Sequence, residues 1–311
     1  MKYYMAPLEG ITGYIFRNTY HEYFGGIDKY FTPFISPNQK KICRTREKND
    51  ILPEHNEGMN VVPQILTNCA QLFVDTVDYL KKYNYHEVNL NLGCPVGTVV
   101  SKKKGAGFLA EKDALRDFLD EIFSSCDVKI SIKTRIGVER AEEFEELLDI
   151  FNRFPIHELI IHPRTREDYY KNKPDLEAFS YGYENSSAKV CYNGDIFTDE
   201  DFQKIMQRFT DLDLVMLGRG ILRYPGIIGL LKDGSRMEKE QFRNFHNDLY
   251  HKYKENLYGD KTVLFKMKEL WSYMIDSFDY DSKIEKKIKK AQRLSEYESA
   301  VRELFSKYTL S

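Results

Sequence analysis

The sequence predicts a (β/α)8 barrel, or TIM barrel, followed by a C-terminal helical bundle. Eight short β-like runs recur between residues 1 and 218, spaced at roughly the 30 residues of one βα unit. Several segments between them are apolar at helical spacing. After Pro225 the β pattern stops and only helical patterns follow. We therefore expect an α/β barrel over residues 1–235 and a helical domain over residues 236–311.

The eight expected strands are apolar runs that lead directly into loops. We place them at residues 4–6, 30–32, 62–65, 88–91, 130–133, 159–162, 190–193 and 215–218. Helices are expected between them around residues 73–80, 115–122, 144–151 and 202–209. Thr198 and Asp201 are typical of an N-terminal cap for the last of these helices.

Two helical patterns are expected in residues 236–311, where 16 Lys and Arg face 13 Asp and Glu, whereas residues 1–235 hold 30 against 35. One pattern is apolar between residues 264 and 278 and the other between residues 284 and 304. The second also carries a basic stripe formed by Lys283, Lys286, Lys287, Lys290 and Arg293. This stripe is either an ordinary solvated face or, beside Lys266 and Lys268, a contact for a phosphate backbone.

Composition narrows the class of protein. No run of about 18 apolar residues is present, so no membrane span is expected. The five cysteines are odd in number and form no C-x-x-C pair, which argues against disulfides and a zinc site. The formal net charge of -2 gives no general affinity for nucleic acid, so a polyanion would need a local patch. We expect a cytoplasmic monomer without a metal ion.

Residues 91–107 carry the most distinctive chemistry of the chain. Cys94 lies between Gly93 and Pro95, where an expected buried strand gives way to a loop. A lone cysteine is often a small buried residue, but here the chain continues into a glycine-rich loop with three consecutive lysines, Lys102, Lys103 and Lys104. A thiol beside a basic loop suits an anionic substrate.

Polar side chains also gather at the carboxyl ends of the expected strands, where TIM barrels place their active sites. They are Gln64, Asn91, Cys94, Lys133, Arg135, His162 and Arg164. Taken singly, each of these residues could have a purely structural role. Lys133 could be a surface lysine with a buried stem, and His162 could be a hydrogen-bonded core histidine. The last two strands end in Asn193-Gly194-Asp195 and Gly218-Arg219-Gly220, and loops at this position of a barrel often bind phosphate. A phosphorylated cofactor is the expected occupant.

Taken as an ordered set, these motifs resemble the tRNA-dihydrouridine synthases along the whole chain. The likeness rests on residues 5–12, Gln64, residues 91–95 with the lysine loop, residues 133–135, 161–166, 193–195 and 218–220, and the tail around residues 265–268. The resemblance implies a flavin enzyme that reduces uridines of tRNA to 5,6-dihydrouridine and uses NADPH to recharge FMN. Pro163 departs from the family, which usually has Gly after the histidine.

The resemblance also implies a role for each site residue. Cys94 would donate the proton to C5 of the uracil while flavin N5 gives the hydride to C6. The flavin would be held by Ala6, Pro7, Leu8, Gln64, Lys133, His162, Asn193, Gly194, Asp195, Gly218 and Arg219. The uracil would meet Asn91, Arg135 and Tyr170, and the tRNA would contact Lys102, Lys103, Lys104, Lys286, Lys287 and Lys290.

Two other readings remain open. An FMN barrel dehydrogenase acting on a free pyrimidine would share the barrel and the thiol but needs no basic helical tail. A non-catalytic RNA-binding barrel would keep the tail but has no need of Cys94, Lys133 and His162 together.

Overall fold

The structure is a computed structural model that describes all 311 residues, and the chain divides into two compact units. The barrel unit comprises residues 1–9, 28–195 and 209–217, and the helical unit comprises residues 10–27, 196–208 and 218–311. Packing therefore assigns residues 10–27, 196–208 and 218–235 to the same unit as the C-terminal helices. The functional boundary expected after residue 235 stays a prediction.

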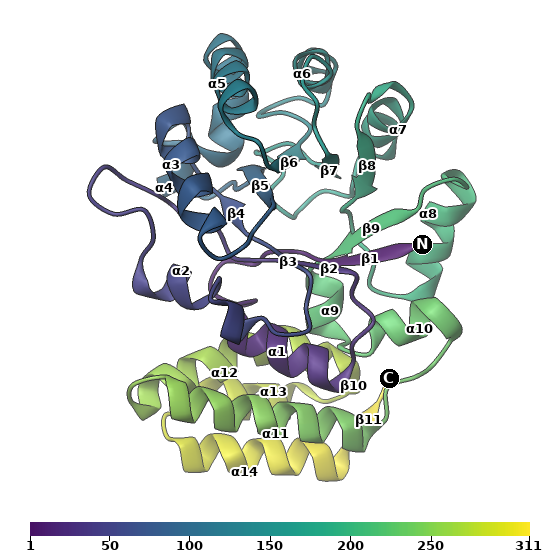
Figure 1. Ribbon diagram of the computed structural model, residues 1–311. Coiled ribbons are helices and arrows are strands. Elements are labelled where there is room, and N and C mark those ends of the chain that lie inside the picture. Colours follow the sequence, from purple (N-terminus) through teal and green to yellow (C-terminus); the bar gives the residue numbers. More distant parts are fainter. The chain divides into compact units, whose positions relative to one another are not determined.

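The barrel unit is built on one parallel sheet in the order β3-β2-β1-β9-β8-β7-β6-β5-β4 (Figure 1). The two edges of this sheet, β3 and β4, are separated only by Pro63. Proline has no backbone N–H to donate, so it interrupts the ladder at this point. The edges are thus two halves of one strand, which pairs with β2 on one side and β5 on the other. The predicted eight-stranded barrel is confirmed.

All eight predicted strand positions are occupied. The strands are β1 (Lys2–Met5), β2 (Lys29–Phe31), β3 (Val61–Val62), β4 (Gln64–Ile65), β5 (Glu87–Leu92), β6 (Lys129–Arg135), β7 (Glu158–His162), β8 (Lys189–Tyr192) and β9 (Leu214–Leu217). Their register places Asn91, near the carboxyl end of β5, beside Lys133 of β6, and Arg135 of β6 beside His162 of β7. Residues of the predicted site therefore lie on adjacent strands.

Helices cover the outside of the barrel unit (Figure 1). They are α2 (Thr45–Asn49), α3 (Ala70–Lys81), α4 (Gly97–Val100), α5 (Lys112–Ser125), α6 (Glu143–Phe151) and α7 (Leu176–Asn185), with 3-10 turns η1 (Pro53–His55) and η2 (Gly105–Ala110). The helices expected at α3, α5 and α6 are confirmed, whereas α7 was not expected. Its Gly182 lowers helix propensity, but a Cβ there would lie 2.7 Å from the Phe144 ring. Close packing against α6 and β7 thus selects glycine.

The barrel interior contains an ion cluster. Lys29 Nζ donates to both oxygens of Glu87, at 2.8 and 3.1 Å, and to Glu158 Oε2 at 3.0 Å. Tyr4 donates its hydroxyl to the other Glu158 oxygen at 2.9 Å, and its ring lies 5.1 Å below the ammonium. The cluster joins the first residues of β2, β5 and β7 to Tyr4 of β1. The buried Glu158 and the partly buried Glu87 therefore share one lysine, and His157 Nε2 lies 3.9 Å from an oxygen of each.

The helical unit contains all of the remaining helices. They are α1 (Tyr14–Tyr23), α8 (Asp199–Arg208), α9 (Arg219–Arg223), α10 (Ile227–Asp233), α11 (Lys239–Asn256), α12 (Asp260–Met274), η3 (Ile275–Ser277), α13 (Ser282–Lys290) and α14 (Leu294–Lys307), with the short antiparallel pair β10 (Phe278–Asp279) and β11 (Thr309–Leu310). The predicted cap of α8 is confirmed, because the Asp201 N–H donates to Thr198 Oγ1 while Asp201 Oδ2 accepts the Thr198 N–H.

The prediction of one helix across residues 284–304 was wrong. The chain breaks after Lys290, because the Ala291 carbonyl accepts the Lys268 ammonium of α12 at 2.9 Å and the backbone there turns to extended geometry. Arg293 is the N-cap of α14, so the basic stripe ends at Lys290. Helix α11 was also missed, although Phe242, Phe245, Leu249 and Tyr253 are buried along one face.

No helix of the structure has the length and apolar character needed to cross a bilayer.

Candidate active site

The predicted thiol lies in a tightly folded loop at the end of β5. Asn91 Oδ1 accepts the backbone N–H groups of Gly93 at 3.0 Å and Cys94 at 2.9 Å, and the Cys94 carbonyl accepts the Ala106 N–H at 3.0 Å. Gly105 has a φ of +57°, and a Cβ there would lie 2.8 Å from the Cys94 carbonyl oxygen. The glycine-rich stretch therefore lets the chain fold back onto the thiol loop.

Cys94 is partly buried, and like the other four cysteines of the chain it forms no disulfide. Burial raises the pKa of its thiol, and the nearby Glu9 carboxylate adds to the rise. A backbone bond from Val96 and the charges of Arg135 and Lys133 act in the opposite direction but do not cancel it. A thiol with a raised pKa keeps its proton at neutral pH, which suits a proton donor better than a nucleophile.

Gln64 and Asn91, two of the predicted site residues, contact one another directly. Asn91 Nδ2 donates to Gln64 Oε1 at 2.7 Å, and Gln64 Nε2 donates to Asn89 Oδ1 at 2.7 Å. Asn89 was not among the predicted site residues. Asn89 is fully buried on β5, and in the sequence it stands inside an apolar run between Val88 and Leu90. Nothing in that run marks it as part of a site.

Lys133 lies on β6 beside Asn91 and two residues before Arg135. Its ammonium has no hydrogen-bond acceptor and no carboxylate partner in the protein, and burial together with the Arg135 charge lowers its pKa to about 8. An unpaired ammonium on a barrel strand is suited to an electron-rich or anionic group of a ligand. The residues present thus fit a reduced flavin ring.

We expect Lys133→Met to stabilise the protein at neutral pH. The unfolded chain keeps the lysine proton up to about pH 10.5, whereas the native state loses it near pH 8, so native stability rises between these values and is lowest below them. Methionine removes the free-energy cost of burying the charged ammonium, which amounts to roughly 3 kcal/mol at most. Urea unfolding without added flavin at pH 7 and pH 9 measures it. A variant that is no more stable than the parent at pH 7 would contradict the conclusion that the buried Lys133 ammonium has no partner.

Arg135 ties two loops together. Its guanidinium donates to the carbonyls of Gly93 at 3.0 Å, Thr165 at 2.6 Å and Tyr169 at 2.9 Å. It also lies 5.5 Å from the ring of Tyr170, which is exposed and 5.8 Å from the His162 ring. Arg135 therefore fixes the loop after β7 against the thiol loop, and its predicted contact with uracil stays a prediction.

Arg164 holds a second network at the end of β7. It makes a bidentate pair with Asp195, at 3.1 and 2.5 Å, and its Nη1 lies 3.1 Å from His162 Nε2. Because arginine can only donate, His162 accepts through Nε2, and the neutral ring carries its proton on Nδ1. Pro163 lies at the centre of a tight turn in which the Arg164 N–H returns to the His162 carbonyl at 2.8 Å. Proline suits this geometry.

The remaining predicted cofactor residues of the barrel unit lie at the ends of β1 and β8. The Ala6 N–H donates to the Leu217 carbonyl at 2.8 Å, and Pro7 and Leu8 follow as a half-buried segment. Asn193 Nδ2 donates to the Met216 carbonyl at 2.7 Å. Gly194 is required because a Cβ would lie 2.0 Å from the Tyr192 hydroxyl.

The other two predicted cofactor residues belong to the helical unit. Gly218 is the N-cap of the short helix α9, and Arg219 is the first residue of that helix. The Arg219 guanidinium lies 5.4 Å from the ring of Phe197, within the same unit.

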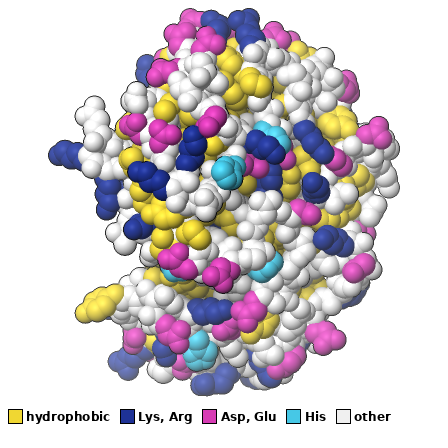
Figure 2. All heavy atoms as spheres, in the orientation of Figure 1, with side chains coloured by type: hydrophobic (Ala, Val, Ile, Leu, Met, Phe, Trp, Pro, Cys, Tyr) yellow, Lys and Arg dark blue, Asp and Glu magenta, His cyan; other side chains and the backbone are white.

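The predicted RNA-contacting lysines differ in their surroundings. Lys102 and Lys103 are exposed, although Lys103 pairs with Glu111 at 3.0 Å, and burial lowers the pKa of the half-buried Lys104. On α13, Lys286 and Lys290 have no carboxylate partner, whereas Lys287 pairs with Glu303 at 2.6 Å. Lys266 and Lys268, considered beside them, donate to the Gly10 and Ala291 carbonyls. On the face drawn in Figure 2, basic and acidic side chains are intermixed.

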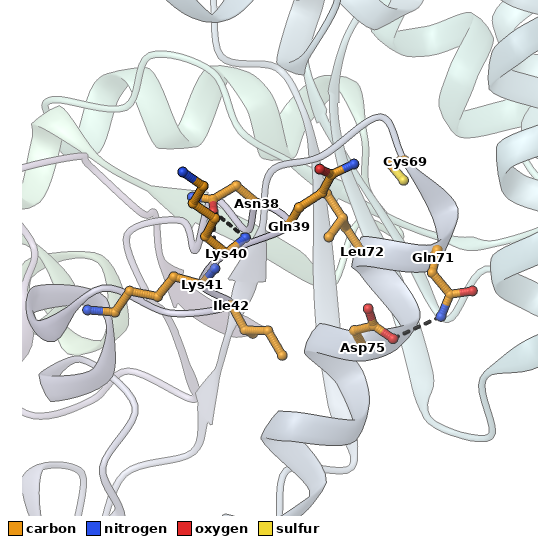
Figure 3. Close-up of a pocket in the computed structure, with 9 residues that line it drawn as sticks. All are labelled: Asn38, Gln39, Lys40, Lys41, Ile42, Cys69, Gln71, Leu72 and Asp75. Atoms are coloured by element: carbon orange, nitrogen blue, oxygen red, sulfur yellow. Dashed lines mark hydrogen bonds between the residues drawn. The ribbon is translucent and has the colours of Figure 1, made fainter.

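A separate hollow of the barrel unit lies between the loop after β2 and helix α3 (Figure 3). It is lined by Asn38, Gln39, Lys40, Lys41, Ile42, Cys69, Gln71, Leu72 and Asp75. Asn38 Oδ1 accepts the backbone N–H groups of Lys40 and Lys41, and Gln71 holds Asp75 at 2.8 Å. The hollow shares no residue with the predicted site.

Comparison with known proteins identifies the family. The profile of the family described as Dihydrouridine synthase (Dus) matches residues 4–309. The chain belongs to the dihydrouridine synthase family. Its relatives include tRNA-dihydrouridine synthase B of Pasteurella multocida, 27% identical over 76% of this chain and 70% of that protein, and tRNA-dihydrouridine(16) synthase of Aquipseudomonas alcaligenes, 25% identical over 73% and 74%. The family consists of flavin oxidoreductases.

Solved structures support the same fold. Histamine dehydrogenase from Rhizobium sp. 4-9 superposes with a TM-score of 0.58 at 11% identity, covering 89% of this chain but only 51% of that chain. The old yellow enzyme from Trypanosoma cruzi gives a TM-score of 0.52 at 9% identity, covering 76% and 89%. At these identities the likeness concerns the barrel fold alone.

Proposed function

We propose that this dihydrouridine synthase reduces uridines of tRNA to 5,6-dihydrouridine, with FMN as the bound cofactor and NADPH as the reductant. The observation that carries the proposal is that the Cys94 thiol, whose pKa is raised, and the Lys133 ammonium, which has no partner in the protein, lie near each other. Cys94 follows β5 and Lys133 lies on β6, and the two side chains are close enough for the lysine charge to lower the thiol pKa. The names of the relatives support tRNA as the substrate.

Saturating the 5,6 double bond of uracil requires a hydride at C6 and a proton at C5. Reduced flavin supplies the hydride when it is bound. Cys94 holds the proton, because burial keeps its thiol un-ionised at neutral pH. The Cys94 thiolate that remains is stabilised by the nearby charges of Lys133 and Arg135 until a solvent proton replaces the one transferred.

Lys133, Gln64, His162 and the segment from Ala6 to Leu8 would hold the flavin. Lys133 offers a charge with no competing partner to the electron-rich edge of the ring. Gln64 uses one N–H and one lone pair within the protein, so one N–H and one lone pair stay available to the ring. Asn193, Gly194, Asp195, Gly218 and Arg219 would hold the phosphate end.

A uridine in folded tRNA must leave its stack to reach a thiol at the end of a barrel strand, at a cost of a few kcal/mol. Asn91, Arg135 and the exposed ring of Tyr170 would receive the base. Phosphate contacts from Lys102, Lys103, Lys104 and the α13 lysines would offset the cost, because each neutralised phosphate releases counterions.

We expect Lys286→Gln/Lys290→Gln to weaken tRNA binding and to reduce the slope of log affinity against log salt by up to about 2. The two lysines have no carboxylate partner, so their charges are available to phosphates, while Lys287 is already paired. Lys204→Gln/Lys254→Gln removes the same charge from other helices of the unit and serves as the control. Equal salt slopes for the two double variants would show that the basic stripe is an ordinary solvated face.

The proposed function is tested first by absorbance and then by product analysis. We expect flavin bands in the purified protein that bleach on anaerobic addition of NADPH, followed by dihydrouridine in tRNA incubated with the reduced protein. A protein that reduces a free pyrimidine but not tRNA would favour the dehydrogenase reading. A colourless protein that binds tRNA but takes up no added FMN would favour the non-catalytic reading.

A further inference from the structure

The thiol loop is connected to the barrel interior by a chain of side-chain amides. Cys94 N–H donates to Asn91 Oδ1 at 2.9 Å, and Asn91 Nδ2 donates to Gln64 Oε1 at 2.7 Å. Gln64 Nε2 donates to Asn89 Oδ1 at 2.7 Å. The chain passes from the loop to β5, to β4 and back to β5.

The chain then continues to a backbone group. Asn89 Nδ2 donates to Ser131 Oγ at 2.9 Å, and the Ser131 hydroxyl donates to the Val88 carbonyl at 3.2 Å. Asn89 and Ser131 are fully buried and face one another across β5 and β6. The chain of side chains therefore ends on backbone groups at both ends, the Gly93 and Cys94 N–H groups and the Val88 carbonyl.

The direction of the chain is determined at both ends. Backbone N–H groups can only donate, so Asn91 must present its oxygen to Gly93 and Cys94 and its NH2 to Gln64. A backbone carbonyl can only accept, so Ser131 must donate to Val88 and accept from Asn89. Reversal of any one amide would set two donors or two acceptors against each other at a buried site, which costs about 1–3 kcal/mol per unsatisfied group.

We propose that Asn89, acting through two neighbouring amides, is a positioning residue for Cys94. It holds the Gln64 amide in the one orientation that presents an oxygen to Asn91. Asn91 in turn keeps its own oxygen on the backbone N–H groups of the thiol loop. Loss of the Asn89 side chain removes the acceptor of Gln64 Nε2, so the Gln64 amide is held through Asn91 alone. Asn91, and the thiol loop that it binds, are then less firmly held in place.

The test measures the reactivity of the Cys94 thiol, which a role confined to global stability would leave unchanged. Iodoacetamide alkylation of the purified protein is followed peptide by peptide by mass spectrometry at neutral pH, with the exposed Cys69 as an internal reference. Asn89→Leu removes both bonds of the amide. We expect Cys94 to react several-fold faster, and about tenfold faster if its pKa falls by one unit towards the value of an open thiol.

A conservative variant and a matched control separate positioning from packing. Asn89→Asp, which burial keeps protonated, retains one oxygen for Gln64 and donates its carboxyl proton to Ser131 Oγ, so alkylation should stay near the parent rate. Thr76→Val removes a buried hydroxyl bond of 2.6 Å on α3, away from the chain of amides, and should leave Cys94 unchanged. If Asn89→Leu does not fold, Ser131→Ala replaces it, because it removes the acceptor of Asn89 and leaves only a small void.

Parent-like alkylation of Cys94 in folded Asn89→Leu or Ser131→Ala would overturn the inference, as would an equal rise in Asn89→Asp. The consequence for catalysis rests on the proposed function: we expect the rate constant for uridine reduction to fall while KM for tRNA is retained. If Asn89→Leu is alkylated faster but the parent protein reduces no uridine, the positioning role is supported and the proposed function is not. Unchanged alkylation in an active enzyme would overturn the positioning role alone.

Discussion

Cys94→Ala should lose about 10²- to 10⁴-fold of the rate of dihydrouridine formation, the usual contribution of a general acid. Alanine fits the space of the thiol and leaves the backbone bonds of Cys94 to Asn91 and Ala106 in place. Flavin content and reduction by NADPH should therefore equal those of the parent. The measurement is single-turnover formation of dihydrouridine by pre-reduced protein with excess tRNA.

The matched control is Cys69→Ala, which removes an exposed thiol of the same unit and should retain the full rate. Cys94→Ser should be nearly as slow as Cys94→Ala, because a hydroxyl is a far weaker acid than a thiol. A parent-like rate in Cys94→Ala would exclude the thiol as the proton donor. Loss of flavin in that variant would instead assign Cys94 to cofactor binding.

Lys29→Met should destabilise the protein by about 3–5 kcal/mol, the cost of breaking a buried ion pair from one side. The variant leaves the carboxylates of Glu87 and Glu158 without their cation, and their side chains are only 17% and 8% exposed. The Tyr4 hydroxyl does not replace it, since it already donates its single proton to Glu158, and His157 Nε2 lies 3.9 Å from each carboxylate, beyond hydrogen-bond distance. Urea unfolding at neutral pH gives the difference.

Lys189→Met provides the comparison, because Lys189 and Asp213 form a pair of 2.5 Å in which both side chains are about half exposed. Exposed pairs contribute about 0–1 kcal/mol, so this variant should stay close to the parent. Adding Glu87→Gln and Glu158→Gln to Lys29→Met should recover part of the loss, because no uncompensated charge then remains. Similar losses in the free energy of unfolding for Lys29→Met and Lys189→Met would show that the ion cluster around Lys29 is hydrated.

Local pattern was sufficient to predict the strands and most helices of the barrel. Short, largely apolar runs such as residues 159–162, repeated at the period of a βα unit, predict buried strands, and β7 lies there. The tail was less predictable from pattern alone. The apolar spacing runs on through Ala291, but Lys268 takes its carbonyl and two helices result.

The sequence by itself determined that a thiol, a lysine and several amides lie at the carboxyl ends of neighbouring strands, because each position depends only on where its own strand ends. The tertiary structure decided which of these groups are free. Arg135 and Arg164 are engaged by carbonyls and a carboxylate that lie 8 to 42 residues away along the chain, whereas Lys133 has no partner. Asn89 belongs to the site only because Gln64 and Ser131 come from other strands. Such partnerships depend on distances between strands, which no local pattern encodes.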